Sequence, residues 1–429
     1  MKYESIDPSL FIENRKNLTR KLPSGSIAIF HSNDLMPRNG DQSHQFRQNS
    51  DLFYLCGIDQ EDSILMIAPE HPIASLREAL FIKKTNAHIA VWEGHKYSKE
   101  EAKKCSGIRN IYWVEEFDPQ FKTAMNYTNV LYLNLNENDR FSTKVPYKDL
   151  RFSDNIKTAF PLHTLERCGP IMSELRTIKS SIEIDLMQKA CNITESAFRR
   201  ILGFVKPGVN ECDIEAEIMH EFLKNRSNGY AYYPIVASGS NSCVLHYQEN
   251  NKECKDGDIL LLDFGADYAN YASDLTRTIP VNGRYTKRQK DLYNACYNVM
   301  KEAISMLRPG ITLDQYNNEV GKVMEGALID VGLLDKNDVD KQKPESPLYK
   351  KYFMHGTSHF IGLDVHDIGN RYAPIKEGMA FTCEPGIYVP EEGIGIRIEN
   401  DIIIGNDKNL DLMNNIPIEA DEIEDLMNS

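Results

Sequence analysis

Two aspartates, Asp263 and Asp274, lie eleven positions apart in the stretch LLLDFGADYANYASDLTRT. Residues 259–264 are branched or aromatic, as in a buried strand, and residues 271–281 read as its partner. A hairpin turning at residues 268–269 would place the two aspartates opposite each other, with Cβ atoms about 5 Å apart. Two carboxylates this close in an apolar setting cannot both ionise unless a cation lies between them. The alternative is that both residues end a hairpin and face water.

A second pair of carboxylates, Glu384 and Glu399, follows the same pattern. The strand at residues 393–404 alternates Ile394, Ile396 and Ile398 with polar residues, which puts Arg397 and Glu399 on one face. Pairing this strand with residues 381–389 across the turn at 390–393 opposes Glu384 to Glu399. Two hairpins would then each present two carboxylates at matched positions.

Three histidines, His355, His359 and His366, fall within 12 residues. A lone histidine near a strand is more often a structural group than a ligand, but a cluster beside carboxylates favours a functional site. His359 and His366 are seven positions apart, so a regular strand would point them to opposite faces. If both serve one site, the chain must bend near Gly362 or one of the two residues must lie outside the strand.

Together these segments predict a centre for divalent metal ions. The predicted ligands are Asp263, Asp274, His359, Glu384 and Glu399. An oxygen-dominated set with one imidazole suits manganese, cobalt, iron or zinc. Four carboxylates balance two such ions, which at a separation of about 3.5–4 Å would hold and deprotonate a bridging water at neutral pH. The reaction class that follows is hydrolysis.

The elements of residues 1–150 predict an α/β domain, a mixed sheet with helical cover. Helices are expected at residues 10–21 and 99–104. Strands are expected at residues 26–31, 52–55, 64–67, 79–82, 89–92, 111–114 and 130–133. Strands that alternate with helices indicate this class of domain.

Residues 151–172, which contain the breaker Gly169-Pro170, are predicted to connect this domain to a second one at residues 173–429. The second domain has strand-rich segments at residues 233–281 and 354–404. Helices are expected at residues 180–202, 211–224, 287–307 and 313–331. Strands and helices in separate blocks favour an α+β domain over a doubly wound sheet.

Composition sets limits on the partners and the compartment. The chain has 429 residues, a net charge of −14 and nine scattered cysteines. The acidic balance argues against a nucleic-acid partner or an anionic membrane. The N-terminus lacks a signal-peptide core, and no apolar run approaches the length of a membrane span. The odd number of the cysteines and the lack of any C-x-x-C pair fit free thiols in a reducing cytoplasm better than a disulfide framework.

The chain resembles the aminopeptidase P and prolidase branch of the pita-bread metallopeptidases over both domains. The resemblance is carried by FRQNSDLFYLCG (46–57), ELRTIKS (174–180), LHYQEN (245–250), LLLDFGADYANYASDLTRT (260–278), MHGTSHFIGLDVHDIG (354–369), EPGIY (384–388) and GIGIRIEND (393–401). The tail PIEADEIEDLM also looks like the end of Xaa-Pro aminopeptidases. The resemblance implies an N-terminal domain of the creatinase and aminopeptidase P type and a pita-bread catalytic domain.

The resemblance also implies roles for the metal ligands. The five residues would bind two divalent ions, usually Mn²⁺ in this branch, with Co²⁺, Zn²⁺ and Fe²⁺ as alternatives. Asp274 and Glu399 would bridge both ions. Glu384 would also carry the proton from the attacking hydroxide to the leaving proline nitrogen.

His246, His355 and His366 match the histidines that the family places around the substrate. His246 and His366 would stabilise the scissile carbonyl and the tetrahedral oxyanion. His355 would line the proline pocket or orient the peptide. Arg397 would support the substrate side and the metal-binding glutamate, and Tyr388 would back the same site.

The implied activity is hydrolysis of the first bond of peptides with proline second, releasing the first residue. An X–Pro bond has no N–H and a fixed φ, so ordinary peptidase clefts reject it. An Xaa-Pro dipeptidase (prolidase) with the same centre is the runner-up. A non-catalytic binding module on the same fold is a third possibility, which the complete ligand set disfavours.

The resemblance further implies a homodimer or homotetramer, because the N-terminal domain in this family often reaches over a neighbouring subunit's site. Trp92 lies where the family places an aromatic residue near the partner's cleft, although an ordinary packing role fits Trp92 equally well. The link between Glu384 and Glu399 spans 15 positions and is shorter than in many members.

Overall fold

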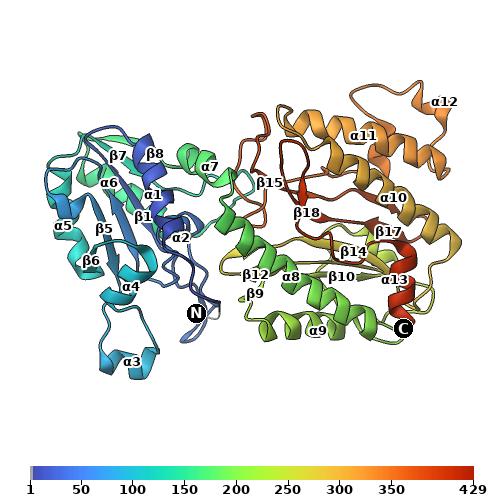
Figure 1. Cartoon of the computed structure of the whole chain (residues 1–429), viewed down its shortest axis with the longest axis horizontal. Helices are drawn as coiled ribbons and strands as arrows, with labels where there is room; N and C mark the ends of the chain where they lie inside the picture. Colours follow the sequence, from blue (N-terminus) through green and yellow to red (C-terminus); the bar gives the residue numbers. More distant parts are fainter. Residues whose placement is uncertain (1–2) are drawn as a thin grey trace. The chain divides into compact units, whose positions relative to one another are not determined.

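The first part of the chain is built on one mixed sheet. The computed structural model describes residues 3–429, which form two compact units, Tyr3–Arg176 and Thr177–Ser429 (Figure 1). The strands of the sheet are β1 (Ser26–His31), β4 (Ile64–Ile67), β5 (Glu78–Ile82), β6 (Asn110–Trp113), β7 (Val130–Leu133) and β8 (Thr164–Arg167). Their order is β6-β5-β4-β1-β7-β8, with β4 antiparallel to both neighbours and the other pairs parallel.

Helices cover this sheet, and a small exposed hairpin, β2 (Pro37–Asn39) and β3 (Gln42–Ser43), extends from the unit. The helices are α1 (Ser9–Lys21), α2 (Ser50–Cys56), α3 (Ala87–Glu93), α4 (Lys99–Ser106), α5 (Phe117–Met125), α6 (Lys148–Ala159) and α7 (Gly169–Thr177). The main core joins strand residues such as Phe81 to Phe117 and Phe121 of α5 and Ile156 of α6. The predicted α/β class is confirmed.

Residues 151–172 do not form the predicted connector. They contribute most of α6, all of β8 and the start of α7, and β8 extends the sheet beside β7. Ile156 is buried in the core, and the partly buried Phe152 packs against it. This segment therefore belongs to the first unit, which runs to Arg176. The Gly169-Pro170 pair starts a helix instead of breaking the chain, because proline is tolerated in a first helical turn.

Two strands predicted in the first unit are helices. Residues 52–55 lie in α2, where the Asn49 side chain accepts hydrogen bonds from two backbone N–H groups and Gly57 ends the helix at φ +66°. Residues 89–92 lie in α3, which Asn86 caps by accepting from the N–H of Ile89. Both runs are short and apolar, and such runs do not distinguish strand from helix without their caps.

The second unit places short sheets between two pairs of helices, α8 (Ser181–Phe204) with α9 (Glu211–Lys224) and α10 (Lys287–Met306) with α11 (Leu313–Asp330) (Figure 1). The strands are β9 (Gly229–Tyr230), β10 (Ile235–Ser238), β11 (Ile259–Phe264), β12 (Ala266–Tyr268), β13 (Tyr271–Ala272), β14 (Leu275–Pro280), β15 (Ala380–Cys383), β16 (Gly386–Val389), β17 (Ile394–Arg397), β18 (Asn400–Ile403) and β19 (Leu410–Asp411). Short helices α12 (Lys336–Val339) and α13 (Ala420–Met427) complete the unit. The predicted α+β class is confirmed, and the four long helices match their predicted ranges to within two residues at each end.

In the predicted strand-rich segment 354–404, strands occupy only the second half. Residues 354–379 form loops with isolated bridges, and regular strands begin at β15. Within residues 3–429, no helix combines the length and apolar character needed to cross a bilayer.

Gly265 lies at the junction of β11 and β12, where two strands approach too closely for a side chain. A Cβ added there would lie 1.7 Å from the backbone oxygen of Ser273. We expect Gly265→Ala to lower the free energy of unfolding by about 3 kcal/mol, because the obstacle is backbone and cannot rotate away. Urea unfolding measures this value. Gly203→Ala in α8 is the matched control, since its Cβ would meet nothing within 4 Å. Equal stability of the two variants would contradict the packing.

Candidate metal centre

The first hairpin brings Asp263 and Asp274 together, but in a different register from the predicted one. Asp263 pairs with Thr276 between β11 and β14, and the turn lies at Ala269 and Asn270, which have φ of +53° and +66°. The predicted pairing of Asp263 with Asp274 is therefore wrong by two residues along β14. An even shift keeps side chains on the same face, so both aspartates still face the same side.

The second hairpin has the predicted register. Gly386 pairs with Arg397 and Cys383 pairs with Asn400, so Glu384 and Glu399 occupy matched positions between these pairs. An isolated bridge between Thr276 and Glu399 joins the two hairpins, with Glu399 N donating to Thr276 O at 3.0 Å. The Thr276 hydroxyl also donates to Glu399 Oε2 at 2.6 Å. Residues more than 120 positions apart thus share one site.

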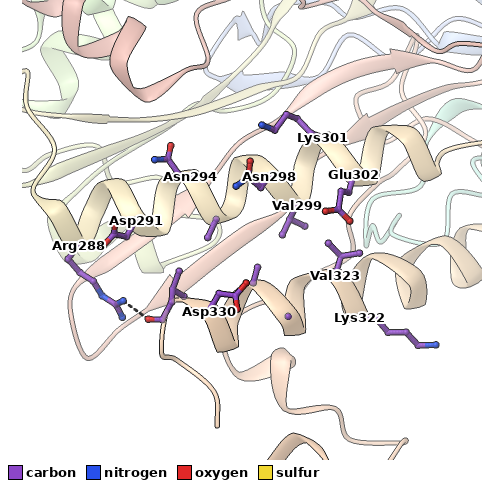
Figure 2. A pocket seen from close by; sticks show the side chains of 14 residues that line it. Arg288, Asp291, Asn294, Asn298, Val299, Lys301, Glu302, Lys322, Val323 and Asp330 are labelled. Carbon is purple, nitrogen blue, oxygen red and sulfur yellow. Dashed lines mark hydrogen bonds between the residues drawn. The ribbon is translucent and has the colours of Figure 1, made fainter. Parts of the chain in front are cut away.

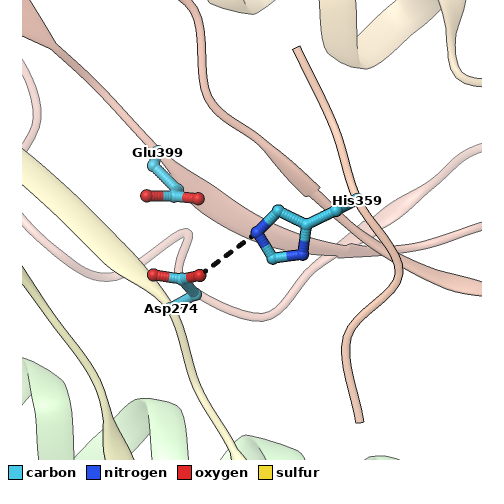
Figure 3. A group of neighbouring side chains, drawn as sticks. All are labelled: Asp274, His359 and Glu399. Carbon is cyan, nitrogen blue, oxygen red and sulfur yellow. Dashed lines mark ion pairs between the residues drawn. The ribbon is translucent and has the colours of Figure 1, made fainter. Parts of the chain in front are cut away.

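His359 faces this group of carboxylates from a loop (Figure 3). One donor atom each from Asp274, His359 and Glu399 lie within 4.8 Å of one another. His359 Nε2 is 3.4 Å from Asp274 Oδ2 and 3.7 Å from Glu384 Oε1. Its Nδ1 lies 3.0 Å from the backbone oxygen of Phe360. A proton on Nδ1 satisfies this contact and leaves Nε2 free to bind a metal ion.

His359 and His366 both lie outside any regular strand, in a loop that passes through Gly362. Residues around Gly362 form no strand, and the two imidazole rings meet edge to face with centroids 4.5 Å apart. A Cβ on Gly362 would lie 2.3 Å from Asp367 Oδ2 and 2.6 Å from Lys179 Nζ. The buried ion pair of Lys179 with Asp367, at 2.9 Å, therefore packs directly against this loop.

Burial and mutual repulsion raise the pKa values of the carboxyl groups. Burial raises the pKa of Asp263. The positive charge of Arg397 lowers this pKa, but by less, and the negative charge of Asp274 raises it further. Burial raises the pKa of Glu384 to about 7, although His359 acts in the other direction. Burial, then the charges of Asp274 and Glu384, hold the pKa of Glu399 well above its usual range. A cation among these groups would remove the cost of ionising them together.

The histidine itself responds to the same charges. Burial lowers the pKa of His359, but its hydrogen bond to Asp274 and the charge of Glu384 outweigh this and raise it to about 9. The donor set of four carboxylates and one imidazole fits a pair of divalent ions in both charge and chemical type.

The residues predicted on the substrate side border the carboxylates. His355 Nδ1 lies 3.7 Å from Glu384 Oε2, and His355 Nε2 lies 2.8 Å from the hydroxyl of Tyr388. Arg397 donates from Nη1 to the same hydroxyl at 2.8 Å and from Nη2 to Asp263 Oδ2. Burial, then the charge of Arg397, lower the pKa of His355 to about 4, and His246 contributes to this shift. His246 is exposed, and its neighbours Leu245 and Tyr247 pack in a cluster with Tyr388, whose hydroxyl contacts His355.

Two residues at the centre were not predicted from the sequence. The Tyr232 hydroxyl donates to Asp263 Oδ1 at 2.6 Å and to Asp274 Oδ1. Asp401 is fully buried behind the centre, and its Oδ2 accepts the backbone N–H of Asp274 at 3.0 Å. Tyr232 precedes β10 without any periodic signal. Asp401 lies two residues after Glu399 in a strand-rich stretch. That spacing places both side chains on the same face, so the sequence could have predicted Asp401.

A groove elsewhere on the second unit is separate from this chemistry. It lies between α10 and α11 and is lined by side chains such as Arg288, Asn298 and Asp330 (Figure 2). None of the predicted site residues lines it.

Comparison with known proteins agrees with this geometry. Residues 185–406 match the model of metallopeptidase family M24, and residues 11–132 match the aminopeptidase P N-terminal domain. The chain belongs to metallopeptidase family M24, as the sequence resemblance predicted.

Proteins similar to this chain include Xaa-Pro aminopeptidases and solved structures of aminopeptidase P. The Xaa-Pro aminopeptidase of Haemophilus influenzae is 33% identical over 97% of both chains. Aminopeptidase PepP of Pseudomonas aeruginosa is 30% identical, with a TM-score of 0.90 over 99% of this chain and 98% of that one. Zinc-substituted Escherichia coli aminopeptidase P, in complex with product, is 30% identical with a TM-score of 0.87 over 99% of both chains.

Removing the Tyr232 hydroxyl tests the assignment of the centre. We expect wild-type protein to bind two Mn²⁺ ions per chain, and Tyr232→Phe to bind them about 10- to 100-fold more weakly, because the hydroxyl orients two ligands. Titration against a competing chelator measures both values. Tyr230→Phe is the control, since its hydroxyl donates to the backbone oxygen of Glu215 at 2.9 Å. Unchanged affinity in Tyr232→Phe would contradict the assignment.

Proposed function

We propose that this chain is an Xaa-Pro aminopeptidase that hydrolyses the first bond of peptides with proline second. The observation that carries the proposal is the convergence of three buried carboxylates, the partly buried Glu384 and His359 beside His355, Tyr388 and Arg397. Relatives named Xaa-Pro aminopeptidase match nearly the whole chain, which supports the same activity here.

The proposed metal ligands are Asp263, Asp274, His359, Glu384 and Glu399. Two divalent ions fit the four carboxylate charges, and Mn²⁺ suits an oxygen-rich set with one imidazole. Such ions supply hydroxide at neutral pH. Tyr232 and Arg397 keep Asp263 oriented through its two oxygens.

Glu384 is the proposed proton carrier. Its two carboxylate oxygens lie 3.7 Å from His359 and 3.7 Å from His355, so it stands between the metal side and the substrate side. A carboxylate in this place can take a proton from the attacking water and deliver it to the proline nitrogen as the bond breaks.

The three histidines are the proposed substrate groups. His355, held by Tyr388, lines the proline pocket or orients the peptide. His366 packs against His359, and His246 lies near His355; both would donate to the carbonyl oxygen as negative charge develops on it.

Product analysis tests the activity. The protein is incubated with an Xaa-Pro dipeptide, a longer Xaa-Pro peptide and the same peptide with alanine second. Mass analysis should show release of the first residue from the longer proline peptide, faster than from the dipeptide and without cleavage of the alanine control. A strong chelator should abolish turnover, and added Mn²⁺ should restore it.

The same experiment separates the alternatives. Faster cleavage of the dipeptide would identify a prolidase. Full activity in chelator would contradict a metal-dependent mechanism. Absence of both bound metal and turnover would support a non-catalytic module.

Self-association is proposed from the first unit. Val91 and Trp92 are adjacent on α3 and each 79% exposed, and exposed apolar groups that lie together mark contact surfaces. Sedimentation velocity should show a dimer or tetramer, and Trp92→Ala should weaken it at least several-fold. Leu162→Ala is the control, because Leu162 is 96% exposed but has no large exposed hydrophobic neighbour in the sequence, and single exposed apolar residues are ordinary. A monomeric wild type would contradict the proposal.

All nine cysteines are free, which supports a reducing compartment such as the cytoplasm.

A further inference from the structure

Glu211 is a buried carboxylate outside the predicted site. It is the first residue of α9 and is fully buried. Oε1 accepts from the N–H of Ser238 at 2.8 Å, its hydroxyl at 2.6 Å, and Asn241 Nδ2 at 3.4 Å. Oε2 accepts from the Tyr247 hydroxyl at 2.8 Å and Lys252 N at 2.9 Å. All five donors are neutral, so this carboxylate is held by hydrogen bonds and not by an opposite charge.

These donors come from one loop and from the strand residue that leads into it. Residues 239–252 connect β10 to the segment before β11 and contain no regular strand. Ser238 and Lys252 lie at the two ends of the loop, and Asn241 and Tyr247 lie within it. Both ends and the middle of the loop are therefore gathered onto one side chain.

A second carboxylate, one turn further along α9, acts on the same loop. Glu215 Oε2 accepts from Asn250 Nδ2 at 2.9 Å. Asn250 also donates to Pro234 O at 3.0 Å and accepts from Val236 N at 3.0 Å. Residues four apart share a helix face, so one face of α9 holds the loop against β10.

The loop carries His246 between two anchored neighbours. Tyr247 is buried in an apolar cluster with Leu261 and Tyr388, and Leu245 packs against the same cluster. The hydroxyl of Tyr388 in turn contacts His355. His246 itself is exposed, so its position depends on the loop backbone on either side of it.

We propose that Glu211 is the positioning residue for His246, fixing the loop at residues 239–252 so that the imidazole meets the bound peptide. The inference rests on the proposed function, because His246 has a catalytic task only when a peptide occupies the centre. A carboxylate that accepts from five donors defines the loop more tightly than an amide would, since the NH₂ group of glutamine would face donors.

A double-mutant cycle tests the proposal in the metal-loaded protein. The variants are Glu211→Gln, Tyr247→Phe and His246→Ala, with each of the first two also combined with the third. Glu211→Gln should lower kcat/KM on a longer Xaa-Pro peptide roughly 10- to 100-fold, as expected for a displaced catalytic group. In the His246→Ala background, the same substitution should change kcat/KM by no more than about twofold.

Two further measurements distinguish positioning from general damage. Hydrogen exchange should rise in residues 239–252 of Glu211→Gln and Tyr247→Phe, while bound Mn²⁺ stays at the wild-type level. Glu217→Gln is the matched control, because Glu217 lies on α9 but pairs with Arg200 near the surface. It should leave both kcat/KM and the loop exchange unchanged. If Glu211→Gln does not fold, Tyr247→Phe, which keeps the packed ring, decides the question.

Three results would overturn the inference. An exchange increase without loss of kcat/KM would show that the loop is held for stability alone. A loss that persists fully in the His246→Ala background would show that Glu211 acts through another group. Wild-type protein that binds Mn²⁺ but does not cleave Xaa-Pro peptides would overturn the proposed function and this inference with it. If the wild type is active but Glu211→Gln changes kcat/KM equally with and without His246, the inference alone is overturned and the proposed function stands.

Discussion

The second unit depends on bringing four like charges into one buried space. Asp263, Asp274, Glu384 and Glu399 come from two hairpins that meet at the bridge between Thr276 and Glu399. Burial and mutual repulsion raise the pKa values of Asp263, Glu384 and Glu399, so folding without a cation disfavours the ionised form of these carboxylates. Divalent cations bound there would resolve this conflict and would tie the stability of the sheet to the chemistry of the centre.

Two buried arginines support the hairpins from the inside. Arg397 contacts Asp263 and Tyr388. Arg277 is fully buried and donates to the backbone oxygens of Glu399 at 2.7 Å and Pro417 at 2.9 Å. A guanidinium presents several donors in a fixed plane, so each arginine can hold several partners at once. The segment before α13 is thereby tied to the strand that carries a predicted metal ligand.

Much of the site could be predicted because its strands have a strict period. The register of the hairpin that carries Glu384 and Glu399 follows from its short turn and alternating isoleucines. The register of the Asp263 hairpin does not, because Ala269 and Asn270 both adopt positive φ and move the turn by one residue. Tyr232 lies outside any periodic element, so only the folded chain brings its hydroxyl to the two aspartates.

The errors in the first unit have a local cause. The apolar residues 52–55 and 89–92 were expected to be strands, yet Asn49 and Asn86 cap helices there. Residues 151–172 carry enough polar side chains to resemble a connector, but Phe152 and Ile156 reach the core from α6. In each case, the deciding contact is a cap or a packing partner that the pattern of hydrophobic residues does not contain.

The registers of the two hairpins imply different tolerance to insertion and deletion during evolution. The turn between Asp263 and Asp274 consists of two buried residues, Ala269 and Asn270, so it has little room to lengthen. One residue added within the paired strands on either side would turn a carboxylate toward the opposite side of the sheet. The turn at residues 390–393 lies beyond the last strand pair, Val389 with Ile394, so it can lengthen without altering the alignment of Glu384 and Glu399. Variation in length among related chains should therefore concentrate at the second turn.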